Sequence, residues 1–265
     1  MAYGVARAVE SRSEGPAEAG HTYNTVIQFD GVQFRRGGSE VLRGITLSVE
    51  RGETVALVGR SGAGKSTVLK LINRMLDPSS GRVLVDGRDT RAWDPTTLRR
   101  QTGYVLQDVG LFPHMTVARN VGLVPALAQW PRQRIEERTE ELLDLVGLSP
   151  REFGARWPSE LSGGEQQRVG VARALAADPP VVLMDEPFGA LDPITRAELH
   201  REFKRIQRRV QKTVVLVTHD MREAFTLADR IGVLDAGVLV EYGPRVALQA
   251  STHPTVRLLV ESALD

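Results

Sequence analysis

The feature that most constrains the fold is the glycine-rich run GRSGAGKST at residues 59–67. It satisfies the pattern of Gly, four residues, then Gly-Lys-Ser. The apolar run Thr54–Val58 before it is typical of a buried strand, and a helix is expected from Ser66 to Leu76. A strand, a tight loop and a helix in this order direct backbone N–H groups and the positive helix end at one point, which suits a polyphosphate. A chance match to so short a pattern would lack this context.

The residue types of the loop suit close contact with a phosphate chain. Glycine at 59, 62 and 64 keeps side chains out of the way. Lys65 is expected to neutralise β- and γ-phosphate charge, and the Ser66 hydroxyl to ligate Mg²⁺. The predicted ATP-binding residues of the loop are Gly59, Ser61, Gly62, Ala63, Gly64, Lys65, Ser66 and Thr67.

Two adjacent acids follow a second apolar run. Val181–Met184 reads as a buried strand and ends in Asp185-Glu186-Pro187. Acids at a strand end are common in isolation, but charges at the exit of a buried strand require partners. A metal ion and a water would supply them, with Asp185 orienting Mg²⁺ and Glu186 polarising the attacking water.

Strands alternate with helices along most of the chain. Strands are expected at 26–34, 45–49, 82–85, 103–106 and 213–217, and helices at 164–177 and 193–210. Between about 117 and 158 the pattern is helical and rich in Glu and Arg. The prediction is an α/β fold with a P-loop NTPase (RecA-like) core and a mixed, mainly parallel sheet. An N-terminal antiparallel β subdomain and an inserted α-helical subdomain complete it.

A third motif, LSGGEQQR at residues 161–168, resembles the signature motif of ABC ATPases. The resemblance implies that Ser162, Gly163 and Gly164 grip the nucleotide held by the opposite subunit, so that a homodimer sandwiches two ATP molecules. Ser162 and two glycines at a helix start also form a phosphate-suited N–H cluster. A plain helix cap by Ser162 accounts for only part of the string.

The same resemblance assigns the other site residues. Gln107 matches the Q-loop glutamine, residues 189–192 the D-loop, and His219 the switch histidine. The implied catalytic residues are Glu186, His219 and Gln107. The implied metal ligands are Ser66, Gln107 and Asp185, and the implied cofactors are ATP and Mg²⁺.

One position departs from the family. Where these proteins commonly stack an aromatic ring on adenine, four residues after Val32, this chain has Arg36. Phe34 would share its face in a regular strand. Two interpretations stay open, a guanidinium stacked on the base and a solvent-facing arginine.

Two segments, GYVLQDVGLFPHMTVARNVGLVP and MDEPFGALDPITRAELHREFKRIQ, are similar to ATPase subunits of quaternary-amine and glycine betaine importers. The implied partners are a second ATPase subunit, integral-membrane permease subunits and, indirectly, an extracytoplasmic substrate-binding protein. The implied location is cytoplasmic, on the inner face of the cell membrane. Import of an amino acid, sulfonate or phosphonate stays open, as does a soluble ABC ATPase outside transport.

Composition narrows the function classes. Lys plus Arg (34) nearly balances Asp plus Glu (33), so no nucleic-acid partner is expected, and the basic run 201–209 reads as a solvated helix face. The absence of cysteine excludes disulfides and thiol catalysis. The expected organisation is a disordered tail at 1–22 and an ABC ATPase domain at 25–260. Its helical subdomain is expected at about 108–165, with no C-terminal regulatory domain.

Overall fold

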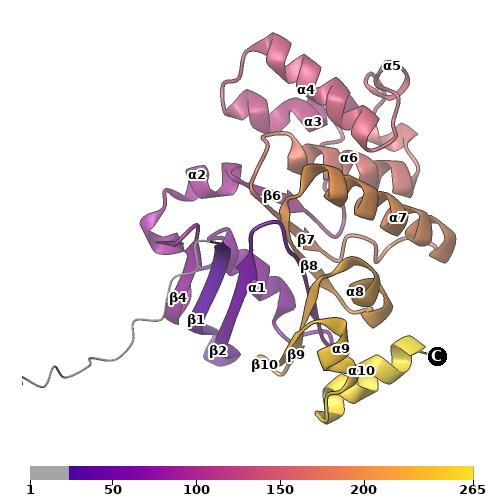
Figure 1. The fold of residues 1–265 in the computed structure, drawn as a ribbon. Helices are drawn as coiled ribbons and strands as arrows, with labels where there is room; N and C mark the ends of the chain where they lie inside the picture. The colour runs from indigo at the N-terminus through magenta and orange to yellow at the C-terminus, as the bar shows by residue number, and fades with distance from the viewer. Residues whose placement is uncertain (1–23, 265) are drawn as a thin grey trace, which may run out of the picture.

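The computed structural model describes residues 24–264, so the predicted disordered tail at 1–22 lies outside the described residues. Two sheets form the framework (Figure 1). The first, in the order β2-β1-β4-β5, joins β1 (Thr25–Arg36), β2 (Ser39–Glu50), β4 (Ser80–Val85) and β5 (Arg88–Asp89). Its pairs are antiparallel, as predicted for the N-terminal part.

The second sheet has six strands in the order β10-β9-β3-β8-β7-β6. They are β3 (Thr54–Val58), β6 (Thr102–Val105), β7 (Val181–Asp185), β8 (Thr213–Thr218), β9 (Arg230–Asp235) and β10 (Val238–Gly243). All neighbouring pairs are parallel except β10 with β9. The predicted mixed, mainly parallel sheet is therefore confirmed.

Register aligns the carboxyl ends of the central strands. Val58 pairs with Thr218, and Asp185 pairs with Val217. On the outer side, Val105 pairs with Met184. The loops that follow β3, β6, β7 and β8 therefore leave the sheet at one edge, where ligands bind in open α/β sheets.

The core lies on both faces of this sheet. Alternate residues of β3 point to opposite sides, as in any strand. Val55 and Leu57 pack with the antiparallel sheet and α1 (Lys65–Ile72). Ala56 and Val58 pack with apolar residues of the later helices. Burial on both faces explains the continuous apolar runs of the parallel strands.

Helices between β6 and β7 form a separate layer above the sheet (Figure 1). They are α3 (Val117–Leu127), α4 (Arg132–Leu145), the short α5 (Pro150–Phe153) and α6 (Gly163–Leu175). A 3₁₀ turn at Pro158–Glu160 precedes α6, and α2 (Pro95–Arg100) follows the 3₁₀ turn Thr90–Ala92. Next along the chain, α7 (Pro193–Val210) contacts α6.

Several C-terminal elements were not predicted. They are α8 (Met221–Leu227), the hairpin β9–β10, α9 (Arg245–Gln249) and α10 (Pro254–Leu264). Among residues 24–264, none of the helices combines the length and apolar character needed to cross a bilayer.

Two local predictions are wrong. The first helix ends at Ile72 rather than Leu76, because Arg74 adopts a left-handed conformation with φ +54°. The N–H groups of Met75 and Leu76 both donate back to the Lys70 carbonyl, which closes the helix end without glycine. The second error is the shared face of Phe34 and Arg36. A register shift between 34 and 35 breaks the alternation, so Phe34 is buried whereas Arg36 is exposed.

Candidate functional site

The glycine-rich loop leaves β3 and enters α1 as expected, and its three glycines are required by geometry, Gly62 because its φ is +81°. Gly64, which precedes the helix, has φ +99°, a region that favours glycine. A Cβ on Gly59 would lie 2.2 Å from the Leu234 carbonyl oxygen. At the tip, Ser61 and Gly62 are exposed, and a Cβ on Gly62 would meet nothing within 4 Å. The loop is thus packed at its two ends and open at its tip.

Lys65 begins α1 and folds back over the loop. Its Nζ donates to the carbonyl oxygens of Gly59 (2.8 Å) and Arg60 (3.1 Å). The side chain is 6% exposed. Burial lowers the pKa of the Lys65 amine, while the charges of Glu186 and Asp185 oppose that shift. A buried ammonium held by carbonyls in an open loop is a cation available to a phosphate.

Ser66 and Asp185 come together from distant parts of the chain. The Ser66 hydroxyl donates to Asp185 Oδ1 at 2.8 Å. The Tyr104 hydroxyl donates to the other oxygen, Oδ2, at 3.4 Å. Burial and the nearby Asp185 charge raise the pKa of Tyr104, which keeps the phenol a donor. Tyr104 was not predicted, since a tyrosine in a strand gives no signal of its own.

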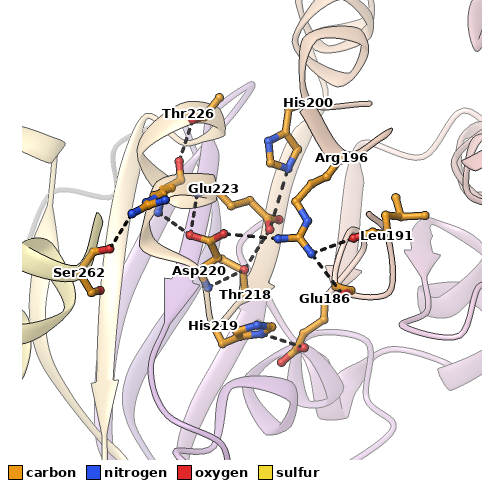
Figure 2. Close-up of polar contacts among 12 residues, drawn as sticks. Glu186, Leu191, Arg196, His200, Thr218, His219, Asp220, Glu223, Thr226 and Ser262 are labelled. Atoms are coloured by element: carbon orange, nitrogen blue, oxygen red, sulfur yellow. Dashed lines mark hydrogen bonds and ion pairs between the residues drawn. The ribbon is translucent and has the colours of Figure 1, made fainter. Parts of the chain in front are cut away.

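Glu186 and His219 form a second contact at the same edge. His219 Nδ1 lies 3.1 Å from Glu186 Oε2 (Figure 2). Glu186 has φ +46°, an uncommon conformation for a non-glycine residue and one that clusters at functional sites. Its N–H donates to the Val217 carbonyl and its own carbonyl accepts from Gly189 N–H. The loop therefore fixes Glu186 from both sides, while the His219 side chain stays 61% exposed.

Gln107 takes no part in the contacts of Ser66 with Asp185 and of Glu186 with His219 within residues 24–264. It lies two residues beyond β6, whose end pairs with β7 one residue before Asp185. The side chain is exposed. Within residues 24–264, no hydrogen bond joins it to Ser66 or Asp185. Gln107 is at the predicted edge but apart from the other candidate metal ligands.

Ser162, Gly163 and Gly164 lie at the start of α6, away from the phosphate loop. The Ser162 hydroxyl accepts from Glu165 N–H (3.3 Å), and Glu165 Oε2 accepts from Ser162 N–H (2.7 Å). This reciprocal capping box, with the Ser162 hydroxyl also donating to the carboxylate, lowers the pKa of Glu165. A Cβ on Gly163 would lie 3.6 Å from Leu191. The motif therefore contacts the segment 189–192, not Lys65.

That segment is anchored to α7. Asp192 Oδ1 accepts from the N–H groups of Ile194 (3.0 Å) and Thr195 (3.1 Å). The Thr195 side chain and these N–H groups lower the pKa of Asp192. Arg196 donates to the Leu191 carbonyl oxygen at 3.0 Å. Arg196 was not predicted, because nothing in a helical arginine indicates which loop it contacts.

The donor set suits Mg²⁺. A hydroxyl and a carboxylate lie side by side beside an open loop, and Mg²⁺ prefers oxygen ligands shared with substrate phosphates and water. Among the described residues, no group of three or more His, Cys, Asp or Glu forms a metal cage. Such a site would need the nucleotide to complete it.

The family model described as ABC transporter matches residues 42–189. The chain belongs to the ABC transporter family.

This chain is similar in sequence to known transport ATP-binding proteins of the same family. The chain is 55% identical over 208 residues to the glycine betaine/carnitine/choline transport ATP-binding protein OpuCA of Bacillus subtilis (strain 168), covering 78% of this chain and 54% of that protein. It is 48% identical over 233 residues to the glycine betaine uptake system ATP-binding protein YehX of Escherichia coli (strain K12), covering 88% and 75%. The chain thus spans about half the length of the first curated relatives that it matches.

A solved structure of the ATP-binding cassette MJ0796, dimeric and bound to ADP and Pi in a post-hydrolysis state, superposes with a TM-score of 0.71 at 33% identity. The match covers 82% of this chain and 98% of that one. It confirms the ABC ATPase fold predicted from the sequence.

Proposed function

We propose that this chain is an ATP-hydrolysing subunit of an ABC importer. The observation that carries the proposal is the convergence of two contacts, Ser66 with Asp185 and Glu186 with His219, at the edge that also holds Lys65. A cation, a hydroxyl–carboxylate pair and a glutamate–histidine pair are the groups needed to bind a triphosphate and direct a water at it. Family membership and the ADP- and Pi-bound neighbour support ATP as the nucleotide.

Each residue has a role derived from its surroundings. Lys65 exchanges its carbonyl partners for phosphate oxygens, and the N–H groups of residues 61–67 cradle the phosphates. Ser66 and Asp185 would hold Mg²⁺, together with Gln107 once the latter moves inward. The bound ion supplies charge neutralisation to the leaving phosphates. Glu186 accepts the proton of the attacking water, and His219, held by Glu186, faces the γ-phosphate.

The site needs a second copy of the chain. Gly163 lies against Leu191 and Gly164 against Thr195, rather than against the phosphate loop of their own chain. The Ser162 N–H is taken by Glu165, so the N–H groups of Gly163 and Gly164 are the ones that would bind another nucleotide. In a two-fold dimer each signature segment would then face the partner's phosphate loop. The dimeric neighbour supports this arrangement.

The proposed transport partner is a membrane permease that docks near Gln107. A groove of about 280 Å³ lies beside β6, α3 and α6, and it includes the exposed apolar side chains of Leu106 (43%) and Phe112 (40%). Exposed apolar side chains in a groove favour a partner's apolar segment. The chain would then be peripheral on the cytoplasmic face of the membrane, with an extracytoplasmic binding protein delivering cargo to the permease.

The proposed cargo is a quaternary amine such as glycine betaine. Support comes from the relatives, whose names specify glycine betaine, carnitine and choline. The nucleotide site cannot be used to infer the cargo, because an ATPase subunit of this kind would contact nucleotide and permease rather than the transported molecule.

ATP hydrolysis by the purified chain tests the enzymatic proposal. Phosphate release should require Mg²⁺, and Lys65→Ala should weaken binding of a labelled ATP analogue. Arg60→Ala, which removes an exposed neighbouring cation, is the matched control. Undiminished binding in Lys65→Ala would overturn the assignment of the phosphate site.

Transport requires the co-expressed permease and binding protein. In proteoliposomes, ATP-dependent uptake of labelled glycine betaine is expected, and Leu106→Asp should release the permease in co-purification without weakening ATP binding. Uptake of an amino acid, sulfonate or phosphonate instead would overturn the cargo while leaving the ATPase in place. Retrieval of DNA or ribosomes in place of a permease would overturn transport itself.

A further inference from the structure

A buried acid, Glu223, lies in the first turn of α8, close to the loop that carries His219 (Figure 2). It is 4% exposed. Oε2 accepts from the Thr218 hydroxyl at 3.1 Å and lies 4.0 Å from His200 Nε2. Within the described part of the chain, neither Glu223 Oε1 nor His200 Nε2 has a hydrogen-bond partner. Two buried polar groups, one able to give a proton and one able to take it, thus face each other.

The charged groups around Glu223 favour its neutral form. Burial raises the pKa of Glu223 to about 7, and the charges of Asp220 and Glu186 add to the shift, while Thr218 and Arg196 oppose it. Burial also lowers the pKa of His200, so this ring is a neutral acceptor. Two other elements pack against α8, namely β3 and α10. Strand β3 bears no charged side chain, and Arg257 and Glu261 of α10 are exposed and paired with each other.

Arg196 connects this buried pair to the loop after Glu186. Its Nη2 donates to the Leu191 carbonyl (3.0 Å) and to the Gly189 carbonyl (3.5 Å). Its Nη1 lies 3.8 Å from Asp220 Oδ2 (Figure 2). The Asp220 N–H in turn donates to Thr218 Oγ1 at 3.0 Å. A continuous polar path therefore runs between the loop of Glu186 and the loop of His219.

We propose that Glu223 is a positioning residue, held uncharged beside His200, that sets the separation of the Glu186 loop and the His219 loop. A neutral carboxyl lets Arg196 keep its bonds to the Leu191 and Gly189 carbonyls. An ionised one attracts Arg196 and repels Asp220 and Glu186, which displaces both loops. The inference deepens the proposed function and rests on it, because its consequence is the rate of ATP hydrolysis.

The test compares kcat and KM for ATP over pH 6–9 in three variants of the full chain. Glu223→Gln mimics the neutral acid, and Glu223→Ala removes the side chain that contacts Thr218 and His200. Glu198→Gln, on the exposed face of α7, is the matched control. The kcat of the wild-type chain and of Glu198→Gln should fall as pH rises through 7. Glu223→Gln should keep the low-pH kcat throughout. Glu223→Ala should lose at least tenfold in kcat at every pH, with KM within twofold.

A Glu223→Gln profile that matches the wild-type fall, or a Glu223→Ala kcat within twofold of wild type, would overturn the inference. If Glu223→Ala shows no cooperative thermal transition, the Glu223→Gln profile decides alone. A different result would overturn the proposed function: if the wild-type chain binds ATP but hydrolyses none, both the ATPase function and the role of Glu223 are wrong. A wild-type chain that hydrolyses ATP while Glu223→Gln follows its pH profile overturns only the role of Glu223.

Discussion

At the scale of single residues, the site depends on pairs drawn from separate strand ends. Asp185 accepts from Ser66, and Glu186 contacts His219, although each partner lies far away along the chain. The left-handed backbone of Glu186 is held by Val217 and Gly189, and its carboxylate is directed by the contact with His219. Fixed direction is what a general base needs to reach one particular water.

Glu186→Gln tests this base. The amide keeps the shape of the side chain but accepts a proton poorly, so steady-state ATP hydrolysis should fall by about 10²- to 10⁴-fold. Binding of a labelled ATP analogue should persist, in contrast to Lys65→Ala, and phosphate release measures the rate. Hydrolysis undiminished in Glu186→Gln would exclude this role.

The pKa of Glu223 makes a separate prediction about stability. Its folded value of about 7 exceeds its ordinary 4.5, so between these pH values the folded chain keeps a proton that the unfolded chain releases. The free energy of unfolding should therefore fall as pH rises through this window, by up to about 3 kcal/mol from this group. Glu223→Gln lacks the titration, so its stability relative to wild type should rise by that amount between pH 5 and 8. Urea unfolding measures it, and a constant difference would contradict the shift.

At the scale of elements, α6 supports the two segments that are proposed to contact the second subunit and the permease. Its first turn carries the capped Ser162, and its last turn carries Arg173, which is 9% exposed. Arg173 donates to the carbonyls of Gly110 (2.7 Å) and Val109 (2.6 Å), in the loop that follows Gln107. Burial lowers the pKa of this guanidinium. One helix therefore links the proposed dimer contact to the proposed permease contact.

Arg173→Met should destabilise the chain by about 3 kcal/mol, because two charge-assisted hydrogen bonds made by a buried guanidinium are lost. Arg99→Met is the matched control. Arg99 also donates to two carbonyls, those of Asn73 (3.3 Å) and Arg74 (2.6 Å), but it is exposed, so water replaces it at a cost below about 1 kcal/mol. Chemical denaturation measures both, and equal losses would contradict the role of burial.

The helices and strands also show which parts of the fold could be predicted from the sequence. The strand before Gly59, the helix from Pro193 to Val210 and the mainly parallel sheet were predicted, because each depends on local pattern. The end of α1 at Ile72 was not, since Arg74 closes it where no glycine marks the turn. Contacts such as Arg173 with Gly110 depend on packing between distant segments, which single-sequence patterns do not encode.

At the scale of the whole molecule, the chain holds two phosphate-suited elements that do not face each other. The phosphate loop lies at the edge of the parallel sheet, whereas the start of α6 lies in the helical layer and contacts Leu191 (Figure 1). We therefore propose that a single copy presents two half-sites. Closure of two copies around ATP would join them, and hydrolysis would release them.

Complementation between two inactive variants tests this central claim most directly. Lys65→Ala removes the cation of the phosphate loop, and Ser162→Arg places a bulky cation at the start of α6. A homodimer of either variant therefore lacks an intact site. A mixed dimer holds one intact site, formed by the loop of the Ser162→Arg chain and the α6 start of the Lys65→Ala chain. The account predicts that mixing the two proteins restores ATP hydrolysis that neither shows alone. A mixture no more active than the sum of its parts would contradict it.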